Sequence, residues 1–371
     1  SYKTGSVAFL ISRTVGAAFR LFLVAKVLQL LVFDLFDIPF IITVILTIAL
    51  IWLYTFKGGI KTIIFTDTLQ TLFMLVSVVV TIVFLASALD LNSIGEVITY
   101  TKESNLSKVF FFEDGNDSQY FWKSFLSGIF ITITMTGLDQ DMMQKNLTCK
   151  NLKDAQKNMV SFSVVLIFVN ILFLILGLML TQYAELNGIT ASKDDLFPTI
   201  AMLPKIGIVT SAFFLLGLIA AAYSSADSAL TSLTTAFCFD IIDIESKPET
   251  ERKNIRKQVH IGFSFVLVFV IVVFDLIFKD VSVIWELFKA AGYTYGPLLG
   301  LFAFGLITKS QIKDKFVWIV AIVAPLLSYI LNLYSKELFN GYEIGFEILI
   351  INGILMFIGL LLIKKSTTQE N

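Results

Sequence analysis

The chain has 371 residues, of which 56% are hydrophobic and only 15% charged, and its formal net charge is −1. Soluble domains carry about 25% charged residues, so this composition indicates a membrane protein. A net charge near zero gives no indication of a nucleic-acid partner, and we expect none. Two cysteines and one histidine support neither a disulfide framework, nor a metal centre, nor histidine-based catalysis, so we also expect no enzyme.

Continuous apolar stretches dominate the chain. A helix that crosses a bilayer needs about 20 mostly apolar residues, and continuous rather than alternating apolar runs favour helices over a barrel. The sequence therefore predicts an all-α polytopic membrane protein with a single transmembrane domain. Ten windows meet the length requirement: 6–33, 36–56, 62–88, 119–144, 158–183, 206–230, 259–279, 281–308, 316–335 and 342–363.

The lysines and arginines predict the orientation of these spans. If the first span runs from the cytoplasm outward and the others alternate, most basic loop residues fall on the inner side. We therefore expect a plasma membrane protein, in a bacterial inner membrane, with its C-terminus in the cytoplasm. Because the chain opens at Ser1 and its first window already holds Arg13, Arg20 and Lys26, we interpret it as truncated at the N-terminus.

An acidic residue follows a glycine pair between the second and third windows. The segment from 57 to 70 reads KGGIKTIIFTDTLQ, and its glycines separate the two spans. At 1.5 Å per residue, Asp67 lies about 9 Å into the next helix from the inner side. Two interpretations stay open. Asp67 belongs to a functional site, or it is a helix-end carboxylate that is hydrated or paired with Lys61.

Three connecting segments are long. The predicted outer loops are 91–119 and 182–205, and the second is a short lid-like segment with two prolines. The inner segment 244–258, IESKPETERKNIRKQ, reads as a solvated charge run facing lipid headgroups, and we assign it no chemistry.

The most informative stretch is LIAAAYSSADSALTSLTTAFCFD, residues 218–240, which is apolar enough to cross a membrane yet carries a carboxylate and many hydroxyls. Placing Asp227 in or near hydrocarbon costs roughly 2.5–3.5 kcal/mol, so a functional site is the default interpretation. Oxygen ligands replace the hydration shell of a hard cation such as Na⁺. The stretch therefore predicts the wall of an ion site. At helical spacing one face carries Ala221, Ser224, Asp227, Ser228, Thr231 and Thr235.

Three ordered motifs carry a resemblance to a known family. They are GGIKTIIFTDTLQ at 58–70, GLDQDMMQKNLTCKNLKDAQ at 137–156, and AAAYSSADSAL at 220–230. Together they resemble the sodium:solute symporter family, whose members carry sodium with sugars, amino acids, vitamins or other small solutes. The resemblance runs from what would be the third core helix of the family to the C-terminus.

The resemblance implies a leucine-transporter-type fold, in which two inverted repeats of five helices surround a site at broken helices. It also implies a sodium site made by the Ala221 carbonyl and the Ser224 and Ser225 hydroxyls. A second sodium site, present in some members, would use Asp67 with Ser224, Asp227 and Ser228. Asp227 makes that second site more anionic, and a proton could take the place of its sodium.

The resemblance also suggests where a solute binds. The sixth core helix would present Thr132 and Thr136, and Lys289 would stand where sugar carriers use glutamine. Lys289 either holds a solute anion or pairs with Glu286 one turn earlier. Arg20 is expected as a second buried cation, either structural or solute-binding. These cations, together with the absence of lysine and proline from the seventh core helix, favour a small carboxylate-bearing solute over a neutral sugar.

The leading hypothesis is sodium-coupled symport of a small molecule across the bilayer by alternating access. Proton-coupled transport on the same fold and sodium–sugar symport remain alternatives, and a membrane sensor is a further one. An enzyme is disfavoured, because two acids on separate helices beside serines are more typical of cation ligands. Nothing in the sequence indicates the oligomeric state.

Overall fold

The computed structural model describes residues 2–55, 60–138, 146–191, 194–206, 208–278 and 282–365; within these ranges the side chains of 53–55, 60–67, 206, 208–210 and 221–227 are not described. Over the described residues the protein is all-α, and its sole β pairing is an isolated bridge between Ile312 and Lys364. The α-helices are α1 (Tyr2–Leu28), α2 (Phe40–Thr55), α3 (Ile60–Ala88), α4 (Ile94–Glu103), α5 (Phe121–Thr132), α7 (Leu152–Asn187), α8 (Leu196–Ala201), α9 (Ile208–Ala236), α10 (Glu249–Ile277), α11 (Val283–Ile307), α12 (Val317–Leu333), α13 (Ser335–Leu338) and α14 (Ile348–Leu362).

Short 3₁₀ and π turns extend or join these helices. The π turns are η1 (Gln29–Phe33), η4 (Ile133–Gly137) and η6 (Phe237–Ile241), which continue α1, α5 and α9. The 3₁₀ turns are η2 (Asp34–Phe36), η3 (Asn105–Ser107), η5 (Pro204–Ile206), η7 (Ile244–Ser246) and η8 (Asp314–Phe316).

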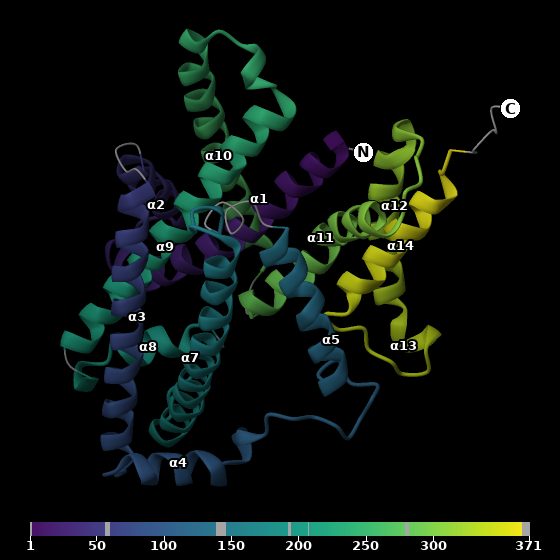
Figure 1. The fold of residues 1–371 in the computed structure, drawn as a ribbon. Coiled ribbons are helices and arrows are strands. Elements are labelled where there is room, and N and C mark those ends of the chain that lie inside the picture. Colours follow the sequence, from purple (N-terminus) through teal and green to yellow (C-terminus); the bar gives the residue numbers. More distant parts are fainter. Residues whose placement is uncertain are drawn as a thin grey trace, which may run out of the picture.

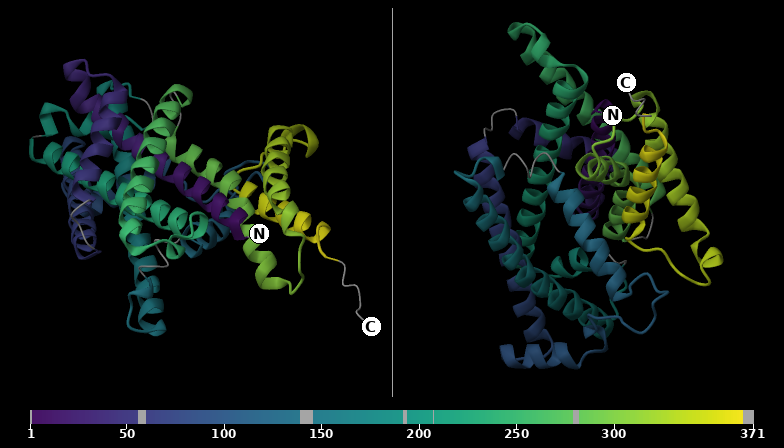
Figure 2. Two further views of the ribbon diagram at one scale, coloured as in Figure 1. Left: turned by 90° about the horizontal axis from the view of Figure 1, so that it is seen from above. Right: turned by 45° about the vertical axis from the view of Figure 1, so that its right-hand side comes forward.

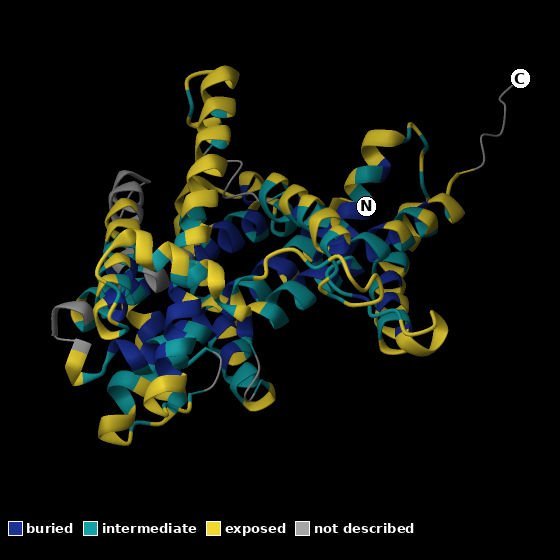
Figure 3. Ribbon diagram, turned by 90° about the horizontal axis from the view of Figure 1, so that it is seen from below, coloured by how far each residue is buried: buried dark blue, intermediate teal, exposed yellow. Residues whose placement is uncertain are grey.

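Several helices have the length and apolarity of membrane spans. Among the described residues, the runs long enough to cross a bilayer are 2–36, 68–88, 152–187, 249–277, 283–307 and 314–333, and shorter apolar helices cover 40–52, 211–220 and 348–362. Their outward faces are apolar. On α7, for example, Val160 and Phe168 are 64% and 68% exposed, and exposed residues cover the outer sides of the helices in Figure 3. Such a surface is typical of contact with lipid.

Three segments expected as loops contain helix, and in one of them, 182–205, α7 runs on to Asn187 and α8 covers Leu196–Ala201. In 91–119, α4 begins with a capping box, since the Ser93 hydroxyl accepts from the Glu96 N–H and the Glu96 carboxylate accepts from the Asn92 N–H. In the inner charge run, α10 begins at Glu249, directly after Pro248. A solvated run of charged residues can be helical when it continues directly into an apolar helical span, as it does in α10. Proline is also common at the start of a helix.

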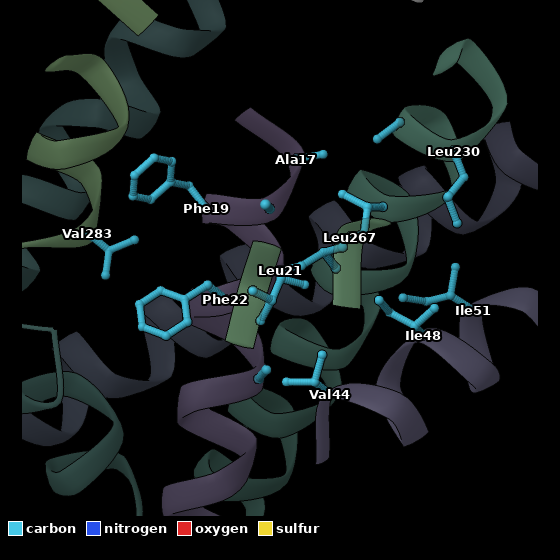
Figure 4. Close-up of a cluster of buried hydrophobic side chains, with 14 residues drawn as sticks. Ala17, Phe19, Leu21, Phe22, Val44, Ile48, Ile51, Leu230, Leu267 and Val283 are labelled. Atoms are coloured by element: carbon cyan, nitrogen blue, oxygen red, sulfur yellow. The ribbon is translucent and has the colours of Figure 1, made fainter. Parts of the chain in front are cut away.

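The largest apolar core joins five helices. It is shown in Figure 4 and lies where α1 crosses α2, α9, α10 and α11. Phe19 and Phe22 of α1 are buried at its centre, and the Phe19 ring lies 4.2 Å from that of Phe274, centre to centre. Burying one such aromatic side chain contributes roughly 1.5–3 kcal/mol in water, although between lipid-embedded helices tight packing matters more than exclusion of water.

Two further clusters flank this core. One joins the C-terminal half of α3 to α7 and α8, and the other joins α11, α12 and α14. Figures 1 and 2 show these groups on opposite sides of α1, with α3, α4 and α7 on one side and α12–α14 on the other.

Helices α11 and α14 pack at close range because α11 carries small residues at every fourth position. Gly292, Gly296 and Gly300 lie against Ile348, Asn352 and Met356 of α14, and a Cβ at any of the three glycines would collide with its neighbour. The fully buried Asn352 amide donates to the backbone carbonyls of Gly292 at 3.1 Å and Tyr293 at 2.8 Å. Small residues at four-residue spacing are the usual means of bringing membrane helices together.

Candidate functional site

The two helices that carry the predicted acidic ligands, α3 and α9, approach closely. A Cβ on Gly217 of α9 would lie 3.2 Å from the Cα and the backbone nitrogen of Met74 on α3. The helices run antiparallel, because the C-terminal half of α3 shares a cluster with α8, the helix that precedes α9. Counted from the Gly217–Met74 contact at 1.5 Å per residue, Asp67 lies about 10 Å along α3 and Asp227 about 15 Å along α9, in the same direction.

The predicted sodium ligands fall on these helices, but most of their side chains are outside the described set. Asp67 is on α3, and Ala221, Ser224, Ser225 and Asp227 are on α9.

Ser228 is the one predicted sodium ligand whose side chain is described. It is partly buried, and its Oγ accepts a hydrogen bond from Arg13 Nη2 of α1 at 3.3 Å. One turn further along α9, Ser232 Oγ accepts from Arg13 Nε at 3.2 Å. The expected hydroxyl face did not include Ser232, and Thr231, which it did include, is exposed. Beyond Ser228 the buried hydroxyl residues of α9 are therefore Ser232 and Thr234.

Arg13 is a candidate site residue that the sequence analysis did not single out. Its side chain is only 8% exposed at the contact of α1 with α9, and its guanidinium reaches two hydroxyls of α9. A charge inside a spanning helix is itself a signal of function, and Arg13 carried that signal as plainly as Arg20 did. A planar guanidinium with several N–H groups suits a carboxylate, which it can bind with two parallel hydrogen bonds.

Arg20 does not fit the expectation of a buried cation, because its side chain is exposed. Arg20 lies seven residues after Arg13, nearly two full helical turns, so helical rotation leaves both within about 20° of one side of α1 and does not explain their different exposure. The side chain of Asp67, which the sequence makes a candidate partner of Arg20, is outside the described set.

Lys289 lies in a polar cavity at the start of α11. Its ammonium is 3.6 Å from Glu286, so the ion pair considered as its alternative role is present, and its side chain is 43% exposed. The cavity has a volume of about 340 Å³, and Trp285, Asn332 and Phe346 also line it. Exposure of this kind weakens the hold of Lys289 on an anion, because water screens the charge.

Thr132 and Thr136 lie where α5 changes its helical form. Thr132 is exposed and its hydroxyl donates to the Gly128 carbonyl at 2.8 Å, whereas Thr136 is partly buried in the π turn η4. A π turn leaves backbone groups without their usual helical partners, and such turns are frequent at functional sites. The residues directly after Leu138 are outside the described set.

An all-α bundle of apolar helices, with a buried arginine and paired hydroxyls between α1 and α9, is typical of a multi-pass membrane protein with a polar site inside the bundle. The chain belongs to the sodium:solute symporter family, whose model matches residues 6–313, and the resemblance drawn from its motifs is thereby confirmed.

Two characterised relatives show similar sequences. The chain is 26% identical over 341 residues to the sodium/sialic acid symporter NanT of Aliivibrio fischeri, a match covering 87% of this chain and 64% of that protein. It is 24% identical over 316 residues to the sodium/sialic acid symporter SiaT of Proteus mirabilis, covering 81% and 61%. The chain thus spans less than two thirds of the length of either relative.

A solved structure of a Na⁺-coupled sialic acid symporter, in a substrate-bound outward-open state, shares the fold. The TM-score is 0.72 at 20% sequence identity, and the match covers 98% of this chain and 75% of that one. The expected all-α, leucine-transporter-type fold is confirmed.

Proposed function

We propose that the protein is a sodium-coupled symporter that imports a small carboxylate-bearing solute by alternating access. The solute class is a sugar acid such as sialic acid, which is what the names of both relatives specify. The observation that carries the proposal is the close approach of α3 and α9 at Gly217, because these helices hold Asp67 and Asp227 at comparable depth. The protein is not an enzyme, and it lies in a bacterial inner membrane with its C-terminus in the cytoplasm.

In this proposal Ala221, Ser224 and Ser225 bind one sodium ion, and Asp67 and Asp227 join Ser224 and Ser228 around a second. Carboxylate and hydroxyl oxygens suit a hard monocation. Thr132 and Thr136 contribute polar groups to the solute, as the family pattern implies.

Arg13 is the cation best suited to hold the solute carboxylate. It is buried, whereas Lys289 is 43% exposed and paired with Glu286, and Arg20 is exposed. Low water access strengthens a charge-assisted hydrogen bond. The solute then contacts Thr132, Lys289 and Arg20 on its way from the outside to the site.

The contact between Arg13 and Ser228 suggests how ion and solute are coupled. A guanidinium 3.3 Å from a sodium ligand raises the local positive potential and disfavours the ion. A solute carboxylate paired with Arg13 offsets that charge, so sodium affinity rises when solute is bound. By linkage, sodium raises solute affinity by the same factor.

Uptake of radiolabelled sialic acid into proteoliposomes tests the proposal, using the full-length protein that contains this chain. A sodium gradient should drive accumulation, whereas a proton gradient alone should not. Asp67→Asn and Asp227→Asn should each abolish sodium-driven accumulation, and Asp90→Asn, at the exposed end of α3, is the matched control. Accumulation that follows the proton gradient would establish the proton-coupled alternative, and solute binding without counterflow would establish a sensor. Competition by neutral sugars alone would establish a sodium–sugar symporter.

A further inference from the structure

An apolar groove runs along the outside of the bundle between α2 and α10. Its volume is about 540 Å³. Both helices contribute residues at the spacing i, i+3, i+4, i+7, which is one continuous face of each helix. The lining residues are Ile45, Ile48, Ala49 and Trp52 of α2, and Ile261, Ser264, Phe265 and Val268 of α10.

The groove opens outward rather than into the core. Phe265 and Ile45 are 70% and 48% exposed, while Ile48, on the groove floor, is buried in the core cluster with Leu267. Figure 4 shows Ile48 and Leu267 among the side chains of this cluster. The one hydroxyl in the lining, that of Ser264, donates to the His260 carbonyl at 2.9 Å and so needs no water. The groove is therefore suited to a hydrocarbon chain.

One end of the groove is basic. Four and eight residues before Ile261, at about 6 and 12 Å along α10, the same helical face carries Lys257 and Lys253, and both are exposed. That face carries no carboxylate between Lys253 and Val268; Glu249 stands on it one turn before Lys253, and Glu251 falls on the other side of the helix. The helix thus continues from the apolar wall to two exposed ammonium groups, in a segment where five basic residues stand against two carboxylates: Lys247, Arg252, Lys253, Arg256 and Lys257 against Glu249 and Glu251.

We propose that this groove binds an anionic phospholipid, with an acyl chain against α2 and α10 and the phosphate held by Lys253 and Lys257. Trp52 has the amphipathic ring that favours the membrane interface, and lysines near a span end reach toward headgroups on flexible stems. An acidic lipid surface attracts basic residues placed beside a spanning helix, whereas a zwitterionic lipid offers no net charge to them. The proposal does not depend on the transported solute.

Trp52 provides a direct probe of the groove. The full-length protein, with Trp122, Trp285 and Trp318 replaced by phenylalanine, is reconstituted in phosphatidylcholine vesicles containing an equal fraction of brominated phosphatidylglycerol or brominated phosphatidylcholine. Quenching of Trp52 fluorescence measures contact with each brominated chain. We expect phosphatidylglycerol to occupy the groove roughly tenfold more favourably than phosphatidylcholine. Should the triple substitution fail to fold, native mass spectrometry of the unmodified protein with the same two lipids makes the comparison.

Two pairs of variants separate the groove from the bulk bilayer. Lys253→Ala with Lys257→Ala should remove the preference for the anionic lipid, whereas Lys309→Ala with Lys313→Ala, the same charge change on another exposed segment, should keep it. Ala49→Phe fills the groove and should reduce quenching by both lipids; Leu50→Phe, on the opposite face of α2, should not.

Equal quenching by the two lipids in the parent protein overturns the proposal, as does a preference that survives removal of both lysines. Protection of Trp52 from both lipids, accompanied by cross-linking between copies through α2, would mean that a second copy of the chain covers the groove. That result also overturns the proposal.

Discussion

The ammonium nitrogen of Lys123 lies 3.5 Å from the centre of the Tyr342 ring. The same ammonium donates to the backbone carbonyls of Asn116 and Glu343, each at 3.0 Å. Lys123 is only 8% exposed, at the start of α5, and its two acceptors belong to segments more than 200 residues apart in the chain. One buried lysine therefore ties the connection before α5 to the connection between α13 and α14.

Replacing Lys123 by methionine should destabilise this junction. Methionine keeps the apolar stem but leaves two carbonyls without their donor and removes the cation–π contact, at a cost of about 1–3 kcal/mol. Thermal unfolding in detergent measures the change. Lys108→Met is the control, since Lys108 pairs with Glu113 at the exposed surface, where ion pairs contribute less than about 1 kcal/mol. Equal effects of the two substitutions would contradict the assigned role.

Tyr342 should titrate unusually late. Burial raises the pKa of Tyr342 to about 12, and so does the neighbouring carboxylate of Glu347, to which the hydroxyl donates at 3.0 Å. Because the folded pKa is above the unfolded value near 10, the stabilising effect is fully present below pH 10 and is lost as pH rises through 12. The tyrosinate difference spectrum between the parent protein and Tyr342→Phe should show this step. Glu347→Gln should move it to lower pH, and a step near pH 10 in the parent would refute the prediction.

Gly296→Ala should weaken the packing of α11 on α14. The added methyl group meets the buried Asn352 side chain, and overpacking of this kind costs typically about 1–3 kcal/mol. Gly305→Ala is the matched control on the same helix, because a Cβ there meets nothing within 4 Å. That substitution should be neutral or stabilising by up to about 1 kcal/mol. Chemical unfolding of both variants measures the change in the free energy of unfolding. A Gly296→Ala protein as stable as the parent would contradict the close packing of α11 on α14.

Arg13→Gln should raise the half-saturation concentration for an anionic solute more than Lys289→Gln does. A buried charge-assisted pair contributes about 1.5–3 kcal/mol, which corresponds to roughly tenfold to hundredfold in affinity. Arg13→Lys should restore only part of it, since an ammonium lacks the planar pair of donors. Uptake measured over a range of solute concentrations tests this ranking. A larger effect at Lys289 would mean that the solute anion binds Lys289, at the start of α11, and not Arg13.

Some of the candidate site residues could be identified from the sequence around them alone. The acids at 67 and 227 stand out because charge is costly within an apolar run, whatever surrounds it. The same rule identifies Arg13, Arg20 and Lys289 as unusual, yet it does not rank them. The ranking came from burial: Arg13 is enclosed between α1 and α9, Arg20 faces outward, and Lys289 is half-exposed.

Helix class, membrane embedding and family membership were determined by the sequence itself, because they depend on unbroken apolar length and on motifs read along the chain. Tertiary structure alone decided which faces meet: Arg13 with Ser228 and Ser232, Gly217 with Met74, and Lys123 with Tyr342. The physical reason is that a span that is apolar on every side packs equally well against lipid or protein. The rotation of such a helix about its axis is therefore set by close contacts with other helices, and the pattern of apolar residues along the helix does not reveal those contacts.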